Sequence, residues 1–572
     1  MARVFPEQLL WEGPCFRLTR VGKGVKILDY IHIQERHRRE RGESVSRHRD
    51  PKVEKRITVE KGKQGAVQLL FGRTTVIMVS LLIQVGVLLL GATLLQRYLV
   101  YLYGFYLALT AVIVIVIINK EGNPDFKLAW MVPMLIIPVF GTILYLFVSM
   151  QAGSRNLNKK LTQIIRDTSK YVRQEDRVIA QLEAENPRVA SLAKYMNEKA
   201  GYPIYRNSTV EYFPLGEDKF RRLVEELKKA ERYIFMEYFI VAEGYMWDTV
   251  REILVKKAKE GVEVRFMYDG TCALTLLPYG YPAYLESLGI RCKMFGPIKP
   301  VLSTVQNNRD HRKIVVIDGH TAFTGGINLA DEYINQKMRF GHWKDTAVMV
   351  KGEAVRNFTL MFLQMWGVDE KREDYYDYLA VPRLEEFARA PGYVLPYGDS
   401  PLDNENVGEL VYMDMLNTAN RYVHIMTPYL ILDHDMITAL TYTAKRGVEV
   451  IILMPHIPDK VYAFTLAKTY YPELLESGVQ IYEYTPGFVH AKVFVSDDDK
   501  AVVGTINMDY RSMYLHFECG AYMYKVPEIA RIEEDMQNCL EVSQRVTLED
   551  CRRRSPWSRL AGGVLRLIAP LM

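Results

Sequence analysis

The sequence predicts an α/β fold with two similar halves, which follow an apolar amino-terminal region. Three observations support this prediction. A short motif of one histidine, one lysine and one aspartate occurs twice, helix-like and strand-like segments alternate through both halves, and three long apolar runs precede them. Helices that alternate with continuously apolar strands indicate sheets covered by helices on both faces. With 572 residues, 49% of them hydrophobic and 25% charged, the chain is long enough for several folded units.

Residues 1–73 form a basic region that we expect to be partly flexible. Its segment 36–63 is dense in charge and offers little to bury. The alternative is a tether to anionic lipid headgroups, which attract basic clusters beside a membrane. The formal charge of +5 is uneven, with basic tracts before residue 74 and after residue 149. Because both tracts flank apolar sequence, they favour a membrane over nucleic acid as partner.

Residues 74–149 are predicted to form transmembrane helices, so we expect a multi-pass membrane protein. The apolar runs cover about 74–95, 99–118 and 128–148, and each is close to the ~20 residues that cross a bilayer. Two spans stay possible if the first pair forms a re-entrant hairpin. Both flanks of the region are basic, so the rule that basic flanks stay cytoplasmic does not decide the topology.

A charged helical linker is predicted over 150–205, followed by two repeats at 206–395 and 396–572. The repeats correspond segment by segment. ERYIFMEYFI matches RYVHIMTPYL as a buried strand, and KKAKEGVEVRFMYDG matches TYTAKRGVEVIILMP as a helix, a glycine cap and a strand. Each repeat carries only one copy of the histidine, lysine and aspartate motif. We therefore expect the repeats to pack with their motifs facing each other as one pseudo-twofold unit.

The repeated motif reads HxKxxxxD and carries the residues that we predict to be catalytic: His311, Lys313 and Asp318 in the first repeat, and His490, Lys492 and Asp497 in the second. On a strand, residues two apart face the same side, so each histidine and lysine would present nitrogens together, which suits an anionic phosphorus centre. For the two aspartates, a structural role as a turn cap at the strand end is favoured over a direct chemical one.

Each motif is followed, fifteen residues after its lysine, by an asparagine in a GGIN or GTIN segment, Asn328 or Asn507. We expect both asparagines to bind phosphate oxygens together with the lysines. A nucleophilic histidine also needs a carboxylate or carbonyl on its other ring nitrogen. The candidates for this orienting role lie downstream in the two repeats, at Asp345 and Glu518.

The other histidines and the cysteines are interpreted as structural. His342, His424, His434 and His516 stand alone on strand-like or helix-like segments and are left out of the predicted site. The six cysteines show no spacing typical of a zinc site or a disulfide framework. Since both motifs also lack acidic metal ligands, we expect neither a metal nor another cofactor.

The paired HxKxxxxD motifs, each followed by a Gly-Gly/Thr-x-Asn segment, resemble the phospholipase D superfamily and, within it, the bacterial cardiolipin synthases. The similarity extends from about residue 74 to the carboxyl terminus, through NPDFKLAWMVPMLIIPVFGTILYLF, MEYFIV, TPYLILD and RLAGGVLRLIAPLM. The long basic region before residue 74 departs from the compact start of that family. The resemblance implies two phospholipase D-like α/β/α sandwich repeats and a location in the bacterial plasma membrane.

The resemblance also implies an activity. One histidine would attack phosphatidylglycerol to form a phosphohistidine while the other protonates the departing glycerol, and a second phosphatidylglycerol would then accept the phosphatidyl group to give cardiolipin. The family pattern favours His311 as the nucleophile and His490 as acid and base, although the internal symmetry does not decide this.

Three alternatives stay open. They are a membrane phospholipase D that releases phosphatidic acid, a transferase with another donor or acceptor such as phosphatidylethanolamine, and a membrane-anchored binding protein. Both motifs are intact, which argues against the binding protein. We expect no nucleic-acid partner, because the repeats mix acidic and basic residues, and we make no prediction of the oligomeric state.

Overall fold

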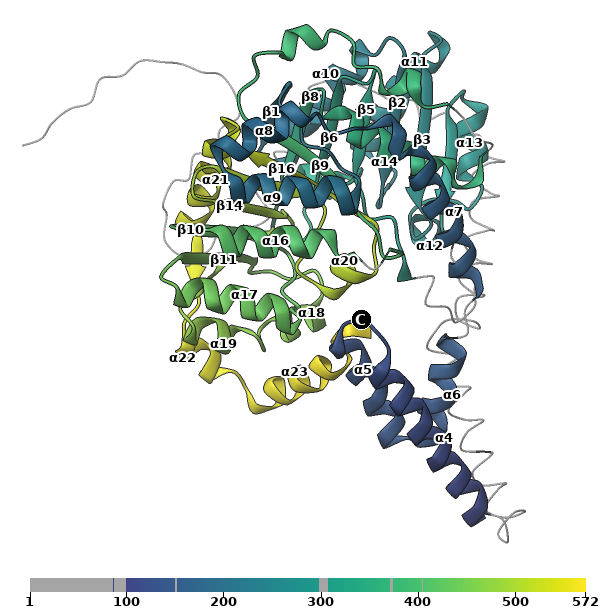
Figure 1. Cartoon of the computed structure of the whole chain (residues 1–572), viewed down its shortest axis with the longest axis vertical. Helices are drawn as coiled ribbons and strands as arrows, with labels where there is room; N and C mark the ends of the chain where they lie inside the picture. The colour runs from purple at the N-terminus through teal and green to yellow at the C-terminus, as the bar shows by residue number, and fades with distance from the viewer. Residues whose placement is uncertain are drawn as a thin grey trace, which may run out of the picture. The chain divides into compact units, whose positions relative to one another are not determined.

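The computed structural model describes residues 86, 99–149, 152–297, 307–370, 374–403 and 405–571 (Figure 1). All of them belong to one compact unit. The basic region 1–73 lies outside the described residues, and so does the apolar run at 74–95 apart from Gly86. The predictions made for these two segments therefore stay predictions.

The first repeat is built on a sheet with the strand order β1-β8-β6-β5-β2-β3-β4. Strands β2, β3 and β4 run parallel, and the other neighbours pair antiparallel. The strands are β1 Ser208–Phe213, β2 Tyr233–Tyr238, β3 Glu263–Asp269, β4 Arg291–Phe295, β5 Ile314–Ile317, β6 Thr321–Gly325 and β8 Ala347–Gly352. The helices are α10 Gly216–Lys229, α11 Tyr245–Lys259, α12 Cys272–Thr275, α13 Tyr281–Ser287, α14 Val355–Trp366 and α15 Tyr376–Leu379.

The second repeat is built on a sheet with the order β17-β12-β11-β10-β14-β15-β16-β9. Its strands are β9 Tyr393–Asp399, β10 Tyr422–Met426, β11 Glu449–Pro455, β12 Gln480–Tyr484, β14 Val493–Ser496, β15 Lys500–Gly504, β16 Glu518–Tyr524 and β17 Ser543–Arg545. Its helices are α16 Val407–Thr418, α17 His434–Lys445, α18 Val461–Ala467, α19 Tyr471–Glu476, α20 Tyr510–Tyr514, α21 Glu528–Glu541, α22 Leu548–Arg553 and α23 Pro556–Ile568.

The two sheets repeat the same topology, which confirms the predicted α/β fold with two similar halves. The order β8-β6-β5-β2-β3-β4 in the first sheet recurs as β16-β15-β14-β10-β11-β12 in the second. The predicted boundary between residues 395 and 396 differs from the structure, because it falls inside β9. That strand pairs along its whole length with β16, so the second repeat already includes Tyr393.

The two sheets share one apolar core. Phe235 of β2 and Val316 of β5 belong to the same buried cluster as Val493 of β14 and Val503 of β15. These strands are buried on both faces, which explains why their sequences are continuously apolar rather than alternating. A short parallel pair, β7 His342–Lys344 with β13 Gly487–Val489, also joins the repeats. This packing fixes the two motif segments relative to each other.

The amino-terminal part of the described chain is helical, with α4 Leu99–Asn119, α5 Pro124–Ile136, α6 Pro138–Ser149, α7 Ala152–Thr168, α8 Asp176–Glu185 and α9 Pro187–Tyr195. Helix α4 coincides with the predicted run at 99–118, and α7, α8 and α9 lie in the predicted helical linker. Over the ranges that the structure describes, no helix is at once long and apolar enough to cross a membrane. The transmembrane helices therefore stay a prediction.

The run predicted as one segment at 128–148 is divided into two helices at Ile137, which differs from the prediction. Pro133 and Pro138 lack the N–H groups that would continue the helical bonding. The chain turns back so closely that a Cβ added to Gly141 would lie 2.6 Å from the Pro133 carbonyl oxygen. The two helices thus pack against each other as a tight helical hairpin.

Helix α5 is joined to the second repeat by polar and aromatic contacts at its first turn. The Asn123 side chain caps α5 by accepting from the Asp125 backbone N–H at 2.9 Å, and its Nδ2 donates to Asp433 and to the Tyr514 hydroxyl at 3.0 and 2.8 Å. Asp125 in turn accepts from the Tyr510 hydroxyl at 2.6 Å. These contacts attach helix α5, and with it the apolar amino-terminal helices, to the second repeat.

Candidate active site

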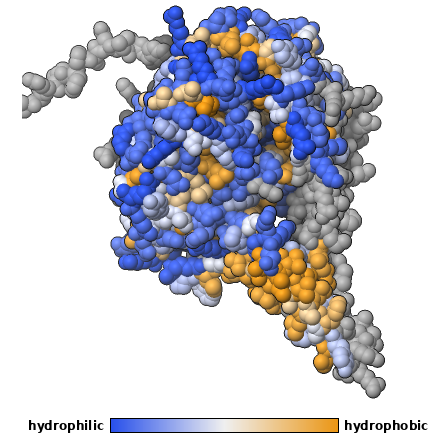
Figure 2. Space-filling model, viewed as in Figure 1, coloured by the Kyte–Doolittle hydropathy of each residue, from blue (hydrophilic) through white to orange (hydrophobic). Residues whose placement is uncertain are grey.

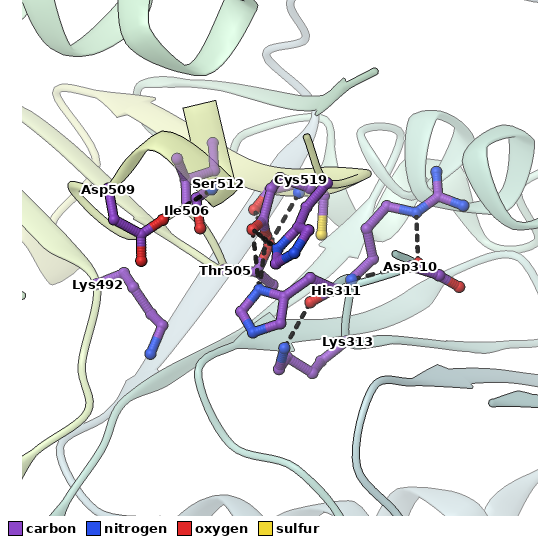
Figure 3. A network of polar contacts seen from close by, with 12 residues as sticks. Asp310, His311, Lys313, Lys492, Thr505, Ile506, Asp509, Ser512 and Cys519 are labelled. Atoms are coloured by element: carbon purple, nitrogen blue, oxygen red, sulfur yellow. Dashed lines mark hydrogen bonds and ion pairs between the residues drawn. The ribbon is translucent and has the colours of Figure 1, made fainter. Parts of the chain in front are cut away.

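The two histidine and lysine pairs lie immediately before equivalent strands. His311 and Lys313 precede β5, and His490 and Lys492 precede β14, so the predicted placement of these pairs within strands is wrong by a few residues. All four side chains are buried. Figure 3 shows His311 and Lys313 of the first repeat close to Lys492 and Thr505 of the second. The structure thus brings the two motifs into one site, as the repeat predicts.

Each histidine is paired with the carboxylate of the other repeat. His311 Nδ1 lies 2.9 and 3.0 Å from the two Glu518 oxygens, and His490 Nδ1 lies 2.7 Å from Asp345 Oδ2. Asp345 and Glu518 are the two orienting residues that the sequence indicated, although it did not show that they exchange partners. Neither repeat therefore holds a complete histidine–carboxylate pair of its own.

Backbone pairing between the repeats produces this exchange. The His311 N–H donates to the carbonyl of Phe517 at 2.9 Å, and the His490 N–H donates to the carbonyl of Lys344 at 2.7 Å. In each case the accepting residue directly precedes the orienting carboxylate in the chain. The same local contact is thus made twice, which places each carboxylate next to the imidazole of the opposite repeat.

The carboxylates select the imidazole tautomer that can act as a nucleophile. A neutral histidine that donates Nδ1–H to a carboxylate has a free lone pair on Nε2. Burial lowers the pKa of His311 well below its usual 6.5, and burial together with Lys492 lowers the pKa of His490 to about 4. Burial alone would raise the pKa of Glu518, but the hydrogen bond with His311 holds it well below its usual range. At neutral pH, both imidazoles are uncharged before substrate binds.

The two lysines supply donors for an anion. Each Nζ donates one bond to the carbonyl oxygen of its own motif histidine, so further N–H groups stay available. Burial lowers the pKa of Lys313 to about 8 and that of Lys492 to about 7. A bound phosphodiester would offset this desolvation, because its negative charge favours the ammonium form.

The two asparagines are not equivalent, although the sequence predicts the same phosphate-binding role for both. Asn328 is held by the fold: its Oδ1 accepts from the Ile240 N–H and its Nδ2 donates to the Tyr333 hydroxyl, both at 2.9 Å. The Oδ1 of Asn507 is buried and has no hydrogen-bond partner among the described residues. Asn507 is therefore the freer of the two to reorient around a ligand.

The GGIN and GTIN segments differ for a reason that the structure makes visible. In the second repeat, the Thr505 hydroxyl donates to Glu518. In the first repeat, the equivalent residue is Gly326, where an added Cβ would lie 2.0 Å from Asp345 Oδ1. A glycine is thus needed beside one orienting carboxylate, and a threonine supports the other.

The aspartates of both motifs cap backbone N–H groups, which fits the structural role that the sequence favours over a direct chemical one. Asp318 accepts from the backbone N–H groups of residues 231–233 at 2.8–2.9 Å. Asp497 accepts in the same way from residues 420–422 at 2.8–3.0 Å. Asp318 follows β5 and Asp497 follows β14, in each case at the end of the strand away from the histidine. Their carboxylates accept hydrogen bonds from the backbone N–H groups at the start of β2 and β10. The turn-cap interpretation of the sequence thus describes both residues.

His516, which the sequence interpretation left out as structural, lies in the site. Its ring centroid is 5.4 Å from that of His311, and its Nδ1 is 3.6 Å from Glu518 Oε1. His311, His516 and Glu518 present ligand atoms within 4.8 Å of one another, a grouping that could hold a metal ion. The signal that could have found His516 is its position two residues before Glu518, which places both on the same face of an extended segment.

Comparisons with known proteins identify the family. The family model described as "Cardiolipin synthase, PLD-like domain" matches residues 223–366 and 412–540, and the model described as "Phospholipase_D-nuclease N-terminal" matches residues 107–149. An uncharacterized protein of Streptococcus mutans is 50% identical over 80% of this chain and 99% of its own length.

Two relatives carry the name cardiolipin synthase. The protein from Alkalihalophilus pseudofirmus is 34% identical over 80% of this chain and 91% of its own length. The protein from Halalkalibacterium halodurans is 32% identical over 87% of this chain and 99% of its own length. These matches confirm the resemblance that the paired motifs indicate. The chain belongs to the cardiolipin synthase family of the phospholipase D superfamily.

Proposed function

We propose that the protein transfers a phosphatidyl group from one phosphatidylglycerol to another, which gives cardiolipin and glycerol. The observation that carries this proposal is the exchanged pairing of His311 with Glu518 and of His490 with Asp345. It supplies two imidazoles with defined tautomers beside two buried lysines. Membership of the cardiolipin synthase family supports the choice of lipid substrates.

In the first step, His311 Nε2 attacks the phosphorus of phosphatidylglycerol. The bond from phosphorus to the headgroup glycerol oxygen breaks, and His490, protonated in the complex, gives its proton to that oxygen. The products are free glycerol and a phosphatidyl group on His311. The lysines hold the non-bridging oxygens, and Glu518 balances the positive charge on the substituted imidazole.

In the second step, His490 removes the proton from a headgroup hydroxyl of a second phosphatidylglycerol. The resulting oxygen attacks phosphorus, the bond to His311 breaks, and cardiolipin forms. One phosphodiester is exchanged for another, so the sequence of steps consumes no nucleotide. His490 regains in this step the proton that it gave up in the first.

The assignment of His311 as nucleophile rests on the asymmetry of the site. Both Glu518 oxygens lie within hydrogen-bonding distance of His311 Nδ1, and Thr505 holds the carboxylate in place. Burial lowers the pKa of both histidines, that of His490 to about 4, so the pKa values alone do not distinguish them. The bound phosphate anion would raise the pKa of His490, which suits it to be the proton donor.

We also propose that the enzyme works at a membrane, with the predicted spans in the bilayer. Hydrophobic residues gather on the surface over α4, α5 and α6 (Figure 2). Within these helices Leu128, Leu135, Ile136 and Ile143 are all more than half exposed. Helix α23 packs against α5 and presents its own exposed apolar face, formed by Trp557, Leu560, Val564, Leu567 and Ile568. A lipid bilayer would cover both surfaces.

The test is to incubate the detergent-solubilised full chain with phosphatidylglycerol alone and to follow lipids and glycerol by mass spectrometry. We expect cardiolipin and glycerol in equal amounts, and neither product from His311→Ala. Phosphatidic acid without cardiolipin would make the protein a hydrolase instead. Cardiolipin that forms only when phosphatidylethanolamine is added would show a different donor.

A further inference from the structure

His516 is a buried histidine with no hydrogen-bond partner for its ring. Its side chain is 8% exposed, and neither Nδ1 nor Nε2 has a partner among the described residues. Leaving a buried polar group unpaired destabilises the folded protein. Because this imidazole lies 5.4 Å from that of His311, centroid to centroid, its missing partner is best sought in the ligand of the site.

The first repeat has a tryptophan at the equivalent position. His516 and Trp343 each stand two residues before an orienting carboxylate, Glu518 or Asp345, and Trp343 packs against His490 with ring centroids 5.5 Å apart. The site therefore has a third imidazole on the His311 side only. The pseudo-twofold symmetry is broken beside the residue that would carry the phosphatidyl group.

We propose that His516 is a phosphate-binding residue, which donates a hydrogen bond from its ring to a non-bridging oxygen of the phosphodiester held at His311. This inference rests on the proposed function, which places that phosphodiester there. Nδ1 lies 3.6 Å from Glu518 Oε1, beyond hydrogen-bonding distance, so the ring is not committed to that carboxylate. A neutral imidazole carries one N–H, which it can donate to a phosphate oxygen.

A metal ion is the competing ligand for the same residues, since His311, His516 and Glu518 could hold one. The charges around the site favour an anion instead. Lys313 and Lys492 point their ammonium groups into the same region, where they attract a phosphate and repel a cation. Glu518 is moreover already engaged by His311 and Thr505.

The test compares His516→Phe and His516→Gln with the full chain in detergent. His320→Gln is the matched control. His320 belongs to the first repeat, and its ring forms a hydrogen bond with the carbonyl of Ile317 rather than with a residue of the site. Two quantities are measured: the Kd of inorganic phosphate by calorimetry, and the KM and kcat for phosphatidylglycerol. The midpoint of thermal unfolding reports whether each variant is folded.

We expect His516→Phe to raise the Kd of phosphate and the KM about tenfold, the loss of one hydrogen bond to a charged group. His516→Gln keeps a donor and should fall between the wild type and His516→Phe, while His320→Gln should not change. The unfolding midpoint of His516→Phe should be equal or higher, since an unpaired buried polar group is removed.

Unchanged phosphate affinity in His516→Phe would overturn the inference. A metal site would also overturn it: EDTA would then abolish the activity of the wild type, and Zn²⁺ would restore it in the wild type but not in His516→Phe. The direct measurement of phosphate binding separates this failure from that of the proposed function. A wild type that makes no cardiolipin refutes the proposed reaction, whereas phosphate binding that does not depend on His516 refutes only the role of this residue.

Discussion

At the scale of residues, the site consists of two imidazoles that each depend on the opposite repeat. His311 is oriented by Glu518 and His490 by Asp345. The sequence indicated all four residues, because motif spacing identifies the histidines and a histidine nucleophile requires a carboxylate. It did not indicate which carboxylate pairs with which histidine, since that is decided by backbone contacts between residues 206 and 146 positions apart in the sequence, His311 with Phe517 and His490 with Lys344.

The first prediction concerns this exchange. We expect Glu518→Gln to slow the formation of the covalent intermediate by at least about 10²-fold, because the amide no longer stabilises the charged imidazole of His311. Asp345→Asn should instead act on His490 and slow both proton transfers. Rapid-quench measurement of the first glycerol released, before steady state, checks the prediction.

Circular dichroism and thermal unfolding serve as controls for the fold of both variants. If Glu518→Gln left the first glycerol release unchanged while Asp345→Asn abolished the covalent intermediate, His490 would be the nucleophile.

At the scale of elements, each motif aspartate links the end of one strand to the beginning of the next one in the sheet by hydrogen bonds, β5 to β2 and β14 to β10. Asp318 and Asp497 have φ angles of 53° and 54°, in the left-handed region that aspartate tolerates better than most residues. From there each carboxylate reaches three successive backbone N–H groups that lead into a central strand. The aspartate of the HxKxxxxD motif is thus needed to hold two neighbouring strands of the sheet together.

The second prediction follows from these caps. We expect Asp318→Ala to lower the free energy of unfolding by about 2–4 kcal/mol, because its buried and half-buried hydrogen bonds to the backbone are lost. Asp497→Ala should lower it less, because the equivalent hydrogen bonds of Asp497 are exposed or half-buried. The activity of each folded molecule should stay within about twofold of the wild type. Activity is to be normalised to the folded fraction from a thermal melt, with Asp435→Ala, an exposed aspartate, as the control. Complete inactivity of a folded Asp318→Ala protein would return this residue to the catalytic set.

The third prediction concerns helix α23. Its Trp557 is 79% exposed, and we expect this side chain to enter the membrane interface. In nanodiscs, brominated lipids should quench part of the tryptophan fluorescence, and Trp557→Phe should remove most of the quenched component. Equal quenching in the wild type and in Trp557→Phe would show that α23 faces water.

At the scale of the whole molecule, a symmetric scaffold carries an asymmetric site. The repeated α/β halves and their facing motifs follow from the sequence, because both halves show the same succession of apolar strands, capped helices and motif. Two features could not be predicted. The hairpin of α5 and α6 depends on a turn inside an apolar run, and β9 crosses the assumed boundary. His516 belongs to the site through contacts between the repeats, and only its spacing from Glu518 indicates this in the sequence.

The fourth prediction is the pH dependence of kcat/KM for phosphatidylglycerol, which reports the groups of the free enzyme. Burial lowers the pKa of Lys492 to about 7 and that of Lys313 to about 8, so both lose their proton as the pH rises through this range. Because the ammonium forms bind the phosphate, we expect kcat/KM to fall as the pH rises from about 6.5 to about 9. His311 stays neutral over this interval, since its pKa lies well below 6.5.

Lys492→Arg is the matched variant for this measurement, because arginine stays charged throughout the range. If it retains activity, its profile should lose the decrease near pH 7 and keep the one near pH 8. A kcat/KM that instead rises between pH 6.5 and 9 would contradict the assignment of the lysines as phosphate-binding cations.

The fifth prediction tests the central claim, that His311 carries the phosphatidyl group between two lipids. The full chain is mixed with phosphatidylglycerol for one turnover, quenched in base, in which phosphohistidine survives, and digested for mass spectrometry. We predict a phosphorylated or phosphatidylated histidine in the peptide that contains His311, which is absent from His311→Ala and disappears when a second portion of phosphatidylglycerol is added. Modification of His490, or cardiolipin formed with no modified histidine at any time, would contradict the account.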